Sequence, residues 1–208
     1  MRPLPAPLLL ITDRTQNPRP LIETVAAAIE GGCRWVMLRE KDLPPDELLD
    51  LAHQISALTS ARGATLSISG DIASAKALKA GLHLPADGKA LAARAALGPA
   101  ALIGQSAHSL QEAEKALDTG ADYVTLSPIF ASASKPGYGP ALGTEGLRKA
   151  AARLQIPIVA LAGIEASNAG ACIKAGADAV AIMGGVMHAE NPAAEVRALL
   201  AALGKASS

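Results

Sequence analysis

Short apolar runs alternate along the chain with segments whose apolar residues recur at helical spacing. Eight of these runs have the length of a strand, and they lie at 7–12, 35–39, 65–69, 81–84, 101–106, 122–127, 157–162 and 179–183. Helical segments are expected between and after them, at 20–31, 45–61, 71–80, 88–96, 109–119, 144–154, 166–175 and 192–203. This alternation predicts a parallel sheet with helices packed against it.

Several of the helical segments end in glycine just before an apolar run. The pattern occurs at Gly31-Gly32, Gly81, Gly120 and Gly176, and glycine favours the left-handed conformation that stops a helix. Eight strand–helix units in one chain predict closure into a barrel. The expected fold is a single (β/α)8 TIM barrel of the α/β class, one domain over 1–208 with 203–208 as a frayed tail. A doubly wound open sheet is the alternative, but no Gly-x-Gly-x-x-Gly follows the first strand.

Composition limits which residues can build the core and which classes of partner the protein is expected to bind. Half of the residues are hydrophobic but only 2% are aromatic, so Ala, Val, Leu and Ile must build the core. Lys and Arg balance Asp and Glu at 19 each, which gives no electrostatic case for nucleic acid or an anionic membrane surface. No apolar run approaches the roughly 18 residues of a membrane span, and the apolar N-terminus is too short and proline-broken for a signal peptide. A soluble cytoplasmic protein is expected, with Cys33 and Cys172 as reduced thiols in helices.

Glycines after the last two predicted strands carry the first functional signal. One apolar run ends at Gly163 and the next ends at Gly184-Gly185. Because glycine has no Cβ, a bound group can contact the backbone at these positions. Two consecutive turns of this kind are typical of the phosphate site at the C-terminal mouth of a barrel. We call Gly163, Gly184 and Gly185 the phosphate cup, and the first hypothesis is an enzyme that holds a small phosphorylated molecule.

Cationic and hydroxyl side chains are expected at the same mouth. Arg39 and Lys41 follow the second strand and point the same way, where they would clamp an anion, while Glu40 points outward. An ordinary mixed-charge loop is the alternative for this segment.

The irregular segment 127–142 is long enough to be an active-site loop after the sixth strand. Its Ser132, Ser134 and Lys135 suit phosphate oxygens, because they combine short hydroxyl donors with one point charge. A flexible polar loop is the alternative.

Ser106 ends the fifth strand and either donates into the site or caps the next helix. Ser109 is the better N-cap, since Glu112 follows three residues later as in a capping box, and this leaves Ser106 for the site. His83 and His108 lie on or just after neighbouring strands, although a lone histidine is more often structural. No cluster of His, Asp or Glu has metal-ligand spacing and no catalytic triad is evident, so no metal ligand is assigned.

Taken together, the motifs resemble the thiamine phosphate synthase family and its TenI-like relatives. The resemblance spans nearly the whole chain and rests on Leu-Arg-Glu-Lys at 38–41, Ile-Gly-Gln-Ser-Ala-His at 103–108, Gly-Ala-Asp-Tyr at 120–123, 128–135, and Ala-Gly-Ile at 162–164. It implies a (β/α)8 barrel that joins a pyrimidine diphosphate to a thiazole phosphate. In the family, Mg²⁺ holds the leaving pyrophosphate while the thiazole nitrogen attacks a pyrimidine cation. A homodimer is expected by analogy with such barrels.

The resemblance also implies roles for particular residues. Basic residues of the family that match Arg39, Lys41 and Lys135 grip the pyrophosphate. The thiazole phosphate is held by the phosphate cup together with positions matching Ser132 and Ser134, which are usually Thr in the family. The serine that matches Ser106 lies near the reacting groups.

The chain departs from the family pattern where the metal would bind. Met37 replaces the usual Gln, Ser69-Gly70 replace an Asn-Asp pair after the third strand, and a second metal-binding Asp falls at Gly88. Asp71 and Asp87 are one residue away from the matching positions, and such a slip near a strand end turns the side chain away. Arg39, Lys41 and Lys135 would only partly offset the missing positive charge.

Three hypotheses stay open on the sequence. The leading one is a thiamine-pathway enzyme that binds a thiazole phosphate, with thiamine phosphate synthase as the nearest named activity. The second is a metal-independent isomerase, because TenI-like relatives also lack metal ligands and resemble this chain at Gly70 and Leu84-Pro85. The base of that branch is a His where this chain has Pro128, so His83 or His108 would have to substitute. The third is a non-catalytic protein that binds a phosphorylated ligand.

Overall fold

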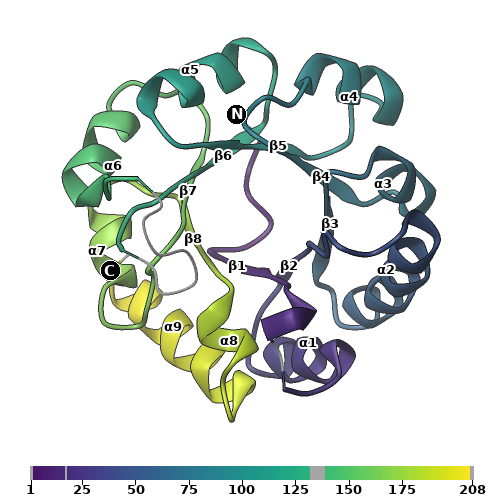
Figure 1. Ribbon diagram of the computed structural model, residues 1–208. Helices are drawn as coiled ribbons and strands as arrows, with labels where there is room; N and C mark the ends of the chain where they lie inside the picture. Colours follow the sequence, from purple (N-terminus) through teal and green to yellow (C-terminus); the bar gives the residue numbers. More distant parts are fainter. Residues whose placement is uncertain (1, 17, 132–138, 207–208) are drawn as a thin grey trace.

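Eight parallel strands close into a barrel in the computed structural model, which describes residues 2–16, 18–131 and 139–206 (Figure 1). The strands are β1 Leu8–Ile11, β2 Trp35–Leu38, β3 Thr65–Ser69, β4 Gly81–Leu84, β5 Ile103–Ala107, β6 Tyr123–Leu126, β7 Ile158–Ala160 and β8 Ala179–Ile182. They pair in sequence order, and β1 pairs with β8 as well as with β2. The expected (β/α)8 barrel is therefore confirmed. The open-sheet alternative is wrong, because β1 and β8, which would be edge strands of an open sheet, pair with each other.

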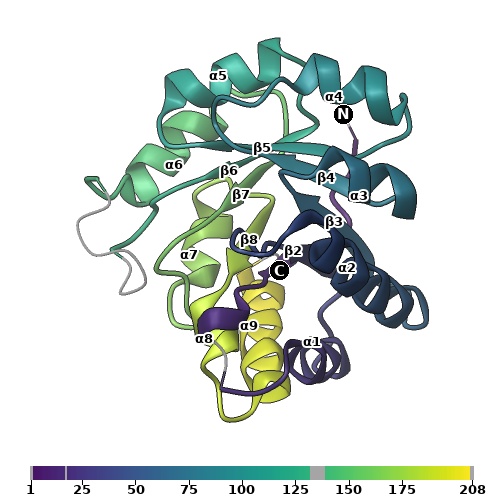
Figure 2. The same cartoon turned by 45° about the vertical axis from the view of Figure 1, so that its right-hand side comes forward.

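Helices surround the barrel on its outer side (Figures 1 and 2). They are α1 Leu21–Glu30, α2 Pro45–Ser60, α3 Ile72–Leu78, α4 Ala90–Leu97, α5 Leu110–Asp118, α6 Gly143–Ala151, α7 Ala169–Lys174, α8 Gly184–Met187 and α9 Pro192–Ala206. Two short elements were not predicted, the 3₁₀ helix η1 Arg14–Gln16 and α8 itself. The tail expected from residue 203 is helical as far as Ala206, because Leu203 is buried in the core.

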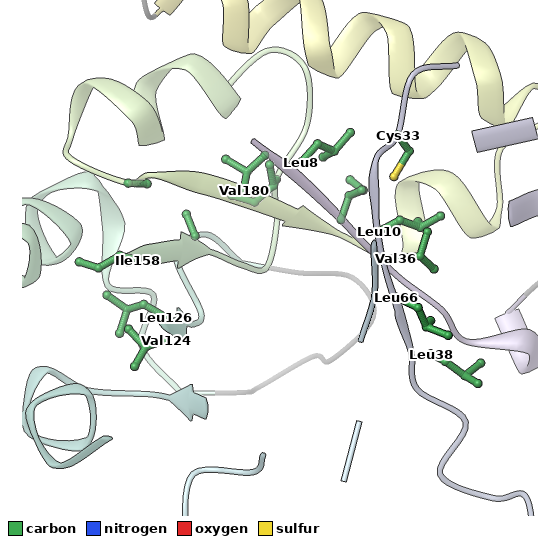
Figure 3. Close-up of a cluster of buried hydrophobic side chains, with 14 of the residues drawn as sticks. Leu8, Leu10, Cys33, Val36, Leu38, Leu66, Val124, Leu126, Ile158 and Val180 are labelled. Atoms are coloured by element: carbon green, nitrogen blue, oxygen red, sulfur yellow. The ribbon is translucent and has the colours of Figure 1, made fainter. Parts of the chain in front are cut away.

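Two sets of apolar side chains build the core. The outer set fills the space between strands and helices and includes Leu8, Leu10 and Val36 (Figure 3). The inner set lies within the barrel and includes Leu9 and Ile11. Alternate residues of β1 thus enter opposite sets, as the two-residue period of a strand requires. Both faces of the strand are buried, which explains why its sequence is a continuous apolar run.

Three of the glycine stop signals are confirmed in the described structure. Gly32, Gly120 and Gly176 have φ angles of 108°, 87° and 100°. The expectation for Gly81 is wrong, because Lys79 supplies the left-handed cap of α3 with φ 51° and Gly81 begins β4. A Cβ on Gly81 would lie only 2.7 Å from the Ser67 hydroxyl oxygen, so this glycine makes room inside the barrel.

The segment before β1 crosses the amino-terminal end of the barrel (Figure 1). Leu4 and Ala6 pack against the inner core set. The Arg2 guanidinium donates to the Pro99 carbonyl at 2.8 Å and lies 3.6 Å from the Asp122 carboxylate. This end is therefore covered by the chain itself.

Other sequence expectations concern thiols and membranes. Cys33 and Cys172 are buried free thiols, but only Cys172 lies in a helix, because Cys33 belongs to the turn between α1 and β2. No helix in the described ranges is long and apolar enough to cross a membrane.

Candidate functional site

A cavity of about 1420 Å³ opens at the carboxyl ends of the strands. Its walls contain residues at or just after each of the eight strands of the described barrel. The active sites of (β/α)8 enzymes lie at this end, where the strand–helix loops converge. Pockets for one drug-sized ligand span roughly 300–1,000 Å³, so this cavity has room for two small molecules.

The floor of the cavity is mostly apolar. Ile11, Met37, Leu161 and Ala181 line it, and they come from β1, β2, β8 and the end of β7. Such a surface favours flat, weakly polar rings and excludes water from beneath them. Met37 is the residue that stands where the family pattern has Gln.

Arg39 and Lys41 both lie on the cavity wall, as their spacing predicted. Arg39 is half-buried and Lys41 is exposed. Neither side chain forms an ion pair with any residue of the described ranges. Two cations that form no ion pair in the described part of the site favour an anionic ligand. Whether they clamp such a ligand stays a prediction.

Glu40 points away from the cavity, but it is buried rather than solvent-facing, with 5% exposure. Its carboxylate accepts hydrogen bonds from the Thr12 hydroxyl at 2.6 Å and from the Arg14 amide at 2.9 Å. The same Thr12 oxygen accepts the Arg39 amide at 3.0 Å. Burial raises the pKa of the Glu40 carboxyl above its ordinary value, although the Thr12 and Arg14 hydrogen bonds oppose this. Glu40 thus ties the loop after β1 to the backbone that carries Arg39, a role that the sequence pattern did not indicate.

All three residues of the phosphate cup line the cavity. Gly163 has φ 63°, and a Cβ there would lie 2.4 Å from the Ala131 carbonyl, so glycine is needed for the approach of two loops as well as for any ligand. Gly184 and Gly185 begin α8, where the N–H groups have no acceptor within the helix.

Ala162, which also lines the cavity, has φ 79° and is a non-glycine residue in the left-handed region. No sequence pattern indicated this left-handed backbone, because alanine does not mark such a conformation. Strained backbone of this kind concentrates at ligand sites. The neighbouring Gly163 carbonyl is held by the Asn168 amide at 2.8 Å, which fixes the loop after β7.

Three of the predicted site residues cannot be placed. Ser132, Ser134 and Lys135 lie outside the described residues. Ala131 and Gly139, which flank them in the described sequence, line the cavity.

The β3–β4 side of the mouth carries the positions of the missing metal ligands. Ser69, Gly70 and Ala86 line the cavity there, but Asp71 and Asp87 do not. Asp71 is instead the N-cap of α3, where its carboxylate accepts the amides of Ala73 at 3.3 Å and Ser74 at 2.9 Å. Asp87 is exposed outside the cavity.

The carboxylates around the cavity decide whether the site fits Mg²⁺. Glu165 is the only carboxylate on the described part of the wall, and the described ranges contain no group of three His, Cys, Asp or Glu that could hold a metal. A buried oxygen without a partner, Gln105 Oε1, belongs to an amide that does not line the cavity. Because Mg²⁺ prefers carboxylate ligands, the described residues do not fit the metal site of the family.

Ser106 and the two candidate histidines lie on the cavity wall. Ser109 is confirmed as the N-cap of α5, since its hydroxyl accepts the Glu112 amide at 3.1 Å, and Ser106 takes no part in that cap. His83 is buried, and its Nε2 lies 3.0 Å from the Ser106 hydroxyl oxygen. Burial, assisted by the charge of Arg39, lowers the pKa of His83 to about 3, so the imidazole is neutral at pH 7. His108 Nδ1 lies 3.1 Å from the Ser127 carbonyl.

Comparisons with known proteins point to one family. The thiamine monophosphate synthase family model matches residues 8–186. The thiamine-phosphate synthase of Moorella thermoacetica is 41% identical over 193 residues, 92% of each chain. The thiamine-phosphate synthase of a Roseiflexus species is 35% identical over 212 residues, 98% of this chain and 90% of the relative. Among solved structures, the thiamine phosphate pyrophosphorylase from Pyrococcus furiosus superposes with a TM-score of 0.87 at 30% identity, covering 97% of this chain and 96% of that one.

Proposed function

This chain belongs to the thiamine monophosphate synthase family and is an enzyme of thiamine biosynthesis, and we propose from this premise that it joins a pyrimidine diphosphate to a thiazole phosphate. The supporting observation is the distribution of groups around one cavity. Arg39 and Lys41 follow β2, the phosphate cup follows β7 and β8, and the apolar floor lies between them. This distribution supports separate positions for a diphosphate, a monophosphate and two rings.

In the proposed reaction the bond between the pyrimidine methylene carbon and the diphosphate oxygen breaks. The thiazole nitrogen forms a bond to the same carbon, and pyrophosphate leaves with the electron pair of the broken bond. The bond exchange itself transfers no proton, and the released pyrophosphate takes up a proton from water near neutral pH. Holding both substrates in one cavity removes much of the entropic barrier of a bimolecular reaction.

The residues of this chain would act mainly through charge and position. Arg39 and Lys41 would face the charge that grows on the leaving pyrophosphate, with Lys135 as a third cation by family resemblance. The backbone of the phosphate cup, with Ser132 and Ser134, would hold the thiazole phosphate. The apolar floor would shield the cationic pyrimidine from water.

Mg²⁺ is the cofactor that the family leads us to expect. Because the described carboxylates do not fit the metal site of the family, we assign no step of the reaction to the ion. Arg39 and Lys41 are the positive charges that the described residues would bring to the diphosphate.

The two other hypotheses are not favoured by the relatives described above, which are synthases by name. We also propose that the chain forms a single domain. By analogy with such barrels we propose a homodimer, and light scattering would measure its mass.

The experiment that tests the proposal is a transfer assay with both substrates, run with Mg²⁺ and again with EDTA. We expect thiamine phosphate and pyrophosphate to form in equal amounts, as measured by chromatography. Calorimetry with the thiazole phosphate alone measures binding separately. Binding without any product above a buffer control in either condition would contradict the proposed transfer and leave a binding role.

A further inference from the structure

Polar side chains lie in a row across the interior of the barrel and reach the cavity. The Trp35 indole N–H donates to the Ser67 hydroxyl at 3.0 Å. Burial raises the pKa of the Tyr123 phenol, and the neighbouring Ser67 hydroxyl opposes this rise. The phenol oxygen lies 3.2 Å from His83 Nδ1, and His83 Nε2 lies 3.0 Å from the Ser106 hydroxyl. Trp35, Ser67 and Tyr123 are fully buried, and only His83 and Ser106 reach the cavity wall.

Glycines on two neighbouring strands make room for this chain of side chains. A Cβ on Gly104 would lie 2.1 Å from Cζ of the Tyr123 ring, and a Cβ on Gly81 would lie 2.7 Å from the Ser67 hydroxyl oxygen. Glycine inside a strand lowers stability and often marks a close approach of another group. The barrel therefore accommodates the polar chain at two strand positions.

The Tyr123 phenol sets the direction of its hydrogen bond to His83, because a buried O–H needs an acceptor. In the described residues, His83 Nδ1, at 3.2 Å, is the one acceptor recorded at hydrogen-bond distance from the phenol oxygen. Tyr123 therefore donates to His83 Nδ1. The opposite direction would leave the phenol proton buried without an acceptor at that distance.

The same reasoning fixes the proton on His83. A neutral imidazole carries one proton, and Nδ1 accepts from Tyr123, so the proton lies on Nε2. Nε2 then donates to the Ser106 oxygen at 3.0 Å, with the Thr125 hydroxyl at 3.3 Å as a second neighbour. Burial keeps the pKa of His83 low, at about 3, so the ring does not gain a second proton near neutral pH.

We propose that His83 and Tyr123 are positioning residues that make Ser106 accept on its inner side and donate its hydroxyl proton into the cavity, to a lone pair of the bound substrate. His83 acts here as a fixed donor and not as a general base. The identity of the substrate rests on the function proposed above, but the direction of the hydrogen bonds does not.

The direct test is nitrogen-15 NMR of the histidine rings in the protein without substrate. We expect His83 to show an unprotonated Nδ1 and a protonated Nε2 that do not change between pH 5 and pH 8. A spectrum of His83→Gln assigns the signal among the four histidines of the chain. A protonated Nδ1, or a ring that titrates in this range, would overturn the proposal, and neither result depends on turnover.

A variant tests the positioning role. Tyr123→Phe keeps the ring beside Gly104 and removes the phenol oxygen, so we expect the His83 signal to shift toward a mixture of the two tautomers. The kcat should fall roughly tenfold with little change in KM, a smaller loss than the roughly 100-fold expected for removal of the donor itself in Ser106→Ala. Thr125→Val is the matched control, since it removes only the second neighbour of Nε2 and should leave the tautomer signal unchanged.

The outcomes separate the two proposals. An unchanged His83 signal and an unchanged kcat in Tyr123→Phe would overturn the positioning role. The expected tautomer in a protein that forms no thiamine phosphate would contradict the proposed function alone.

Discussion

The two sides of the cavity mouth bring different kinds of chemical group to a ligand. The side after β7 and β8 presents backbone, with Ala162 and Gly163 in the left-handed region and Gly184-Gly185 at the start of α8. The side after β3 and β4 depends on side chains, and there Ser69-Gly70 stand where the family pattern has Asn-Asp. A site made of backbone needs the right loop geometry, whereas a site made of side chains is changed by single substitutions that leave the fold intact.

Asp71 illustrates this difference between the two sides. It directly follows the cavity-lining Gly70 in the sequence, yet both oxygens of its carboxylate accept hydrogen bonds from amides of α3. The negative charge stabilises the start of that helix and does not face the cavity. A carboxylate near a strand end is therefore not a metal ligand unless its neighbours leave its oxygens available.

The largest expected effect comes from changing the backbone side. Gly185→Asp would add a negative charge within the phosphate cup, and we expect the KM for the thiazole phosphate to rise roughly 100-fold, equivalent to about 3 kcal/mol. The fold should survive, because the closest atom to a Cβ at Gly185 is the end of the flexible Ile182 side chain, at 2.9 Å, and Glu195 Oε1 lies 4.0 Å away. Steady-state kinetics and calorimetry measure the change.

Gly204→Asp is the matched control for that variant. A Cβ at Gly204 meets nothing within 4 Å, and the residue lies in α9 outside the cavity wall. Equal KM values for the two variants and the wild type would show that the phosphate does not bind at the phosphate cup.

A smaller effect is expected from rebuilding the side-chain side. The double variant Ser69→Asn/Gly70→Asp would restore the family pair, and Gly70 has both the space and the φ of 79° that Asn and Asp tolerate best after glycine. We expect Mg²⁺ at about ten times its Kd to stabilise the double variant by roughly 1.4 kcal/mol, a rise in Tm of a few degrees, with no rise for the wild type. Differential scanning calorimetry with Mg²⁺ or EDTA measures this, and an equal rise for both proteins would place the metal site elsewhere.

The smallest effect concerns Asp71. Removing the cap in Asp71→Ala should lower the free energy of unfolding by about 1 kcal/mol and leave the KM for each substrate unchanged. Urea denaturation measures the first quantity and kinetics the second. Asp71→Ser retains a capping oxygen and should recover most of the stability. Loss of activity in both variants at unchanged stability would assign the carboxylate to the site and break the comparison.

Most of the fold follows from the sequence because the strands are buried on both faces. The apolar runs at 65–69 and 81–84 coincide with β3 and β4. Errors occur where the backbone leaves the sheet, as in the run at 157–162, because β7 ends at Ala160 before the left-handed turn at Ala162. The helix α8 was missed because it is four residues long and has no capping side chain.

The candidate site was less predictable, and the reason is geometric. Strand alternation places Arg39 and Lys41 on the cavity wall, since it depends only on local spacing. The contact of Glu40 with Thr12 joins loops that are 28 residues apart in sequence. The hydrogen bonds of His83 join β4 to β5 and β6, and no spacing rule gives their distances.

The pairing of β1 with β8 joins the first strand to be synthesised to the last one. Leu8 lies opposite Val180, so the ribosome releases the first strand long before its second neighbour exists. Until Ala179–Ile182 emerges, β1 presents an unpaired strand edge of the kind that promotes aggregation. The nascent chain is therefore expected to be most vulnerable just before its last strand is made, and chaperone protection would matter most at that stage.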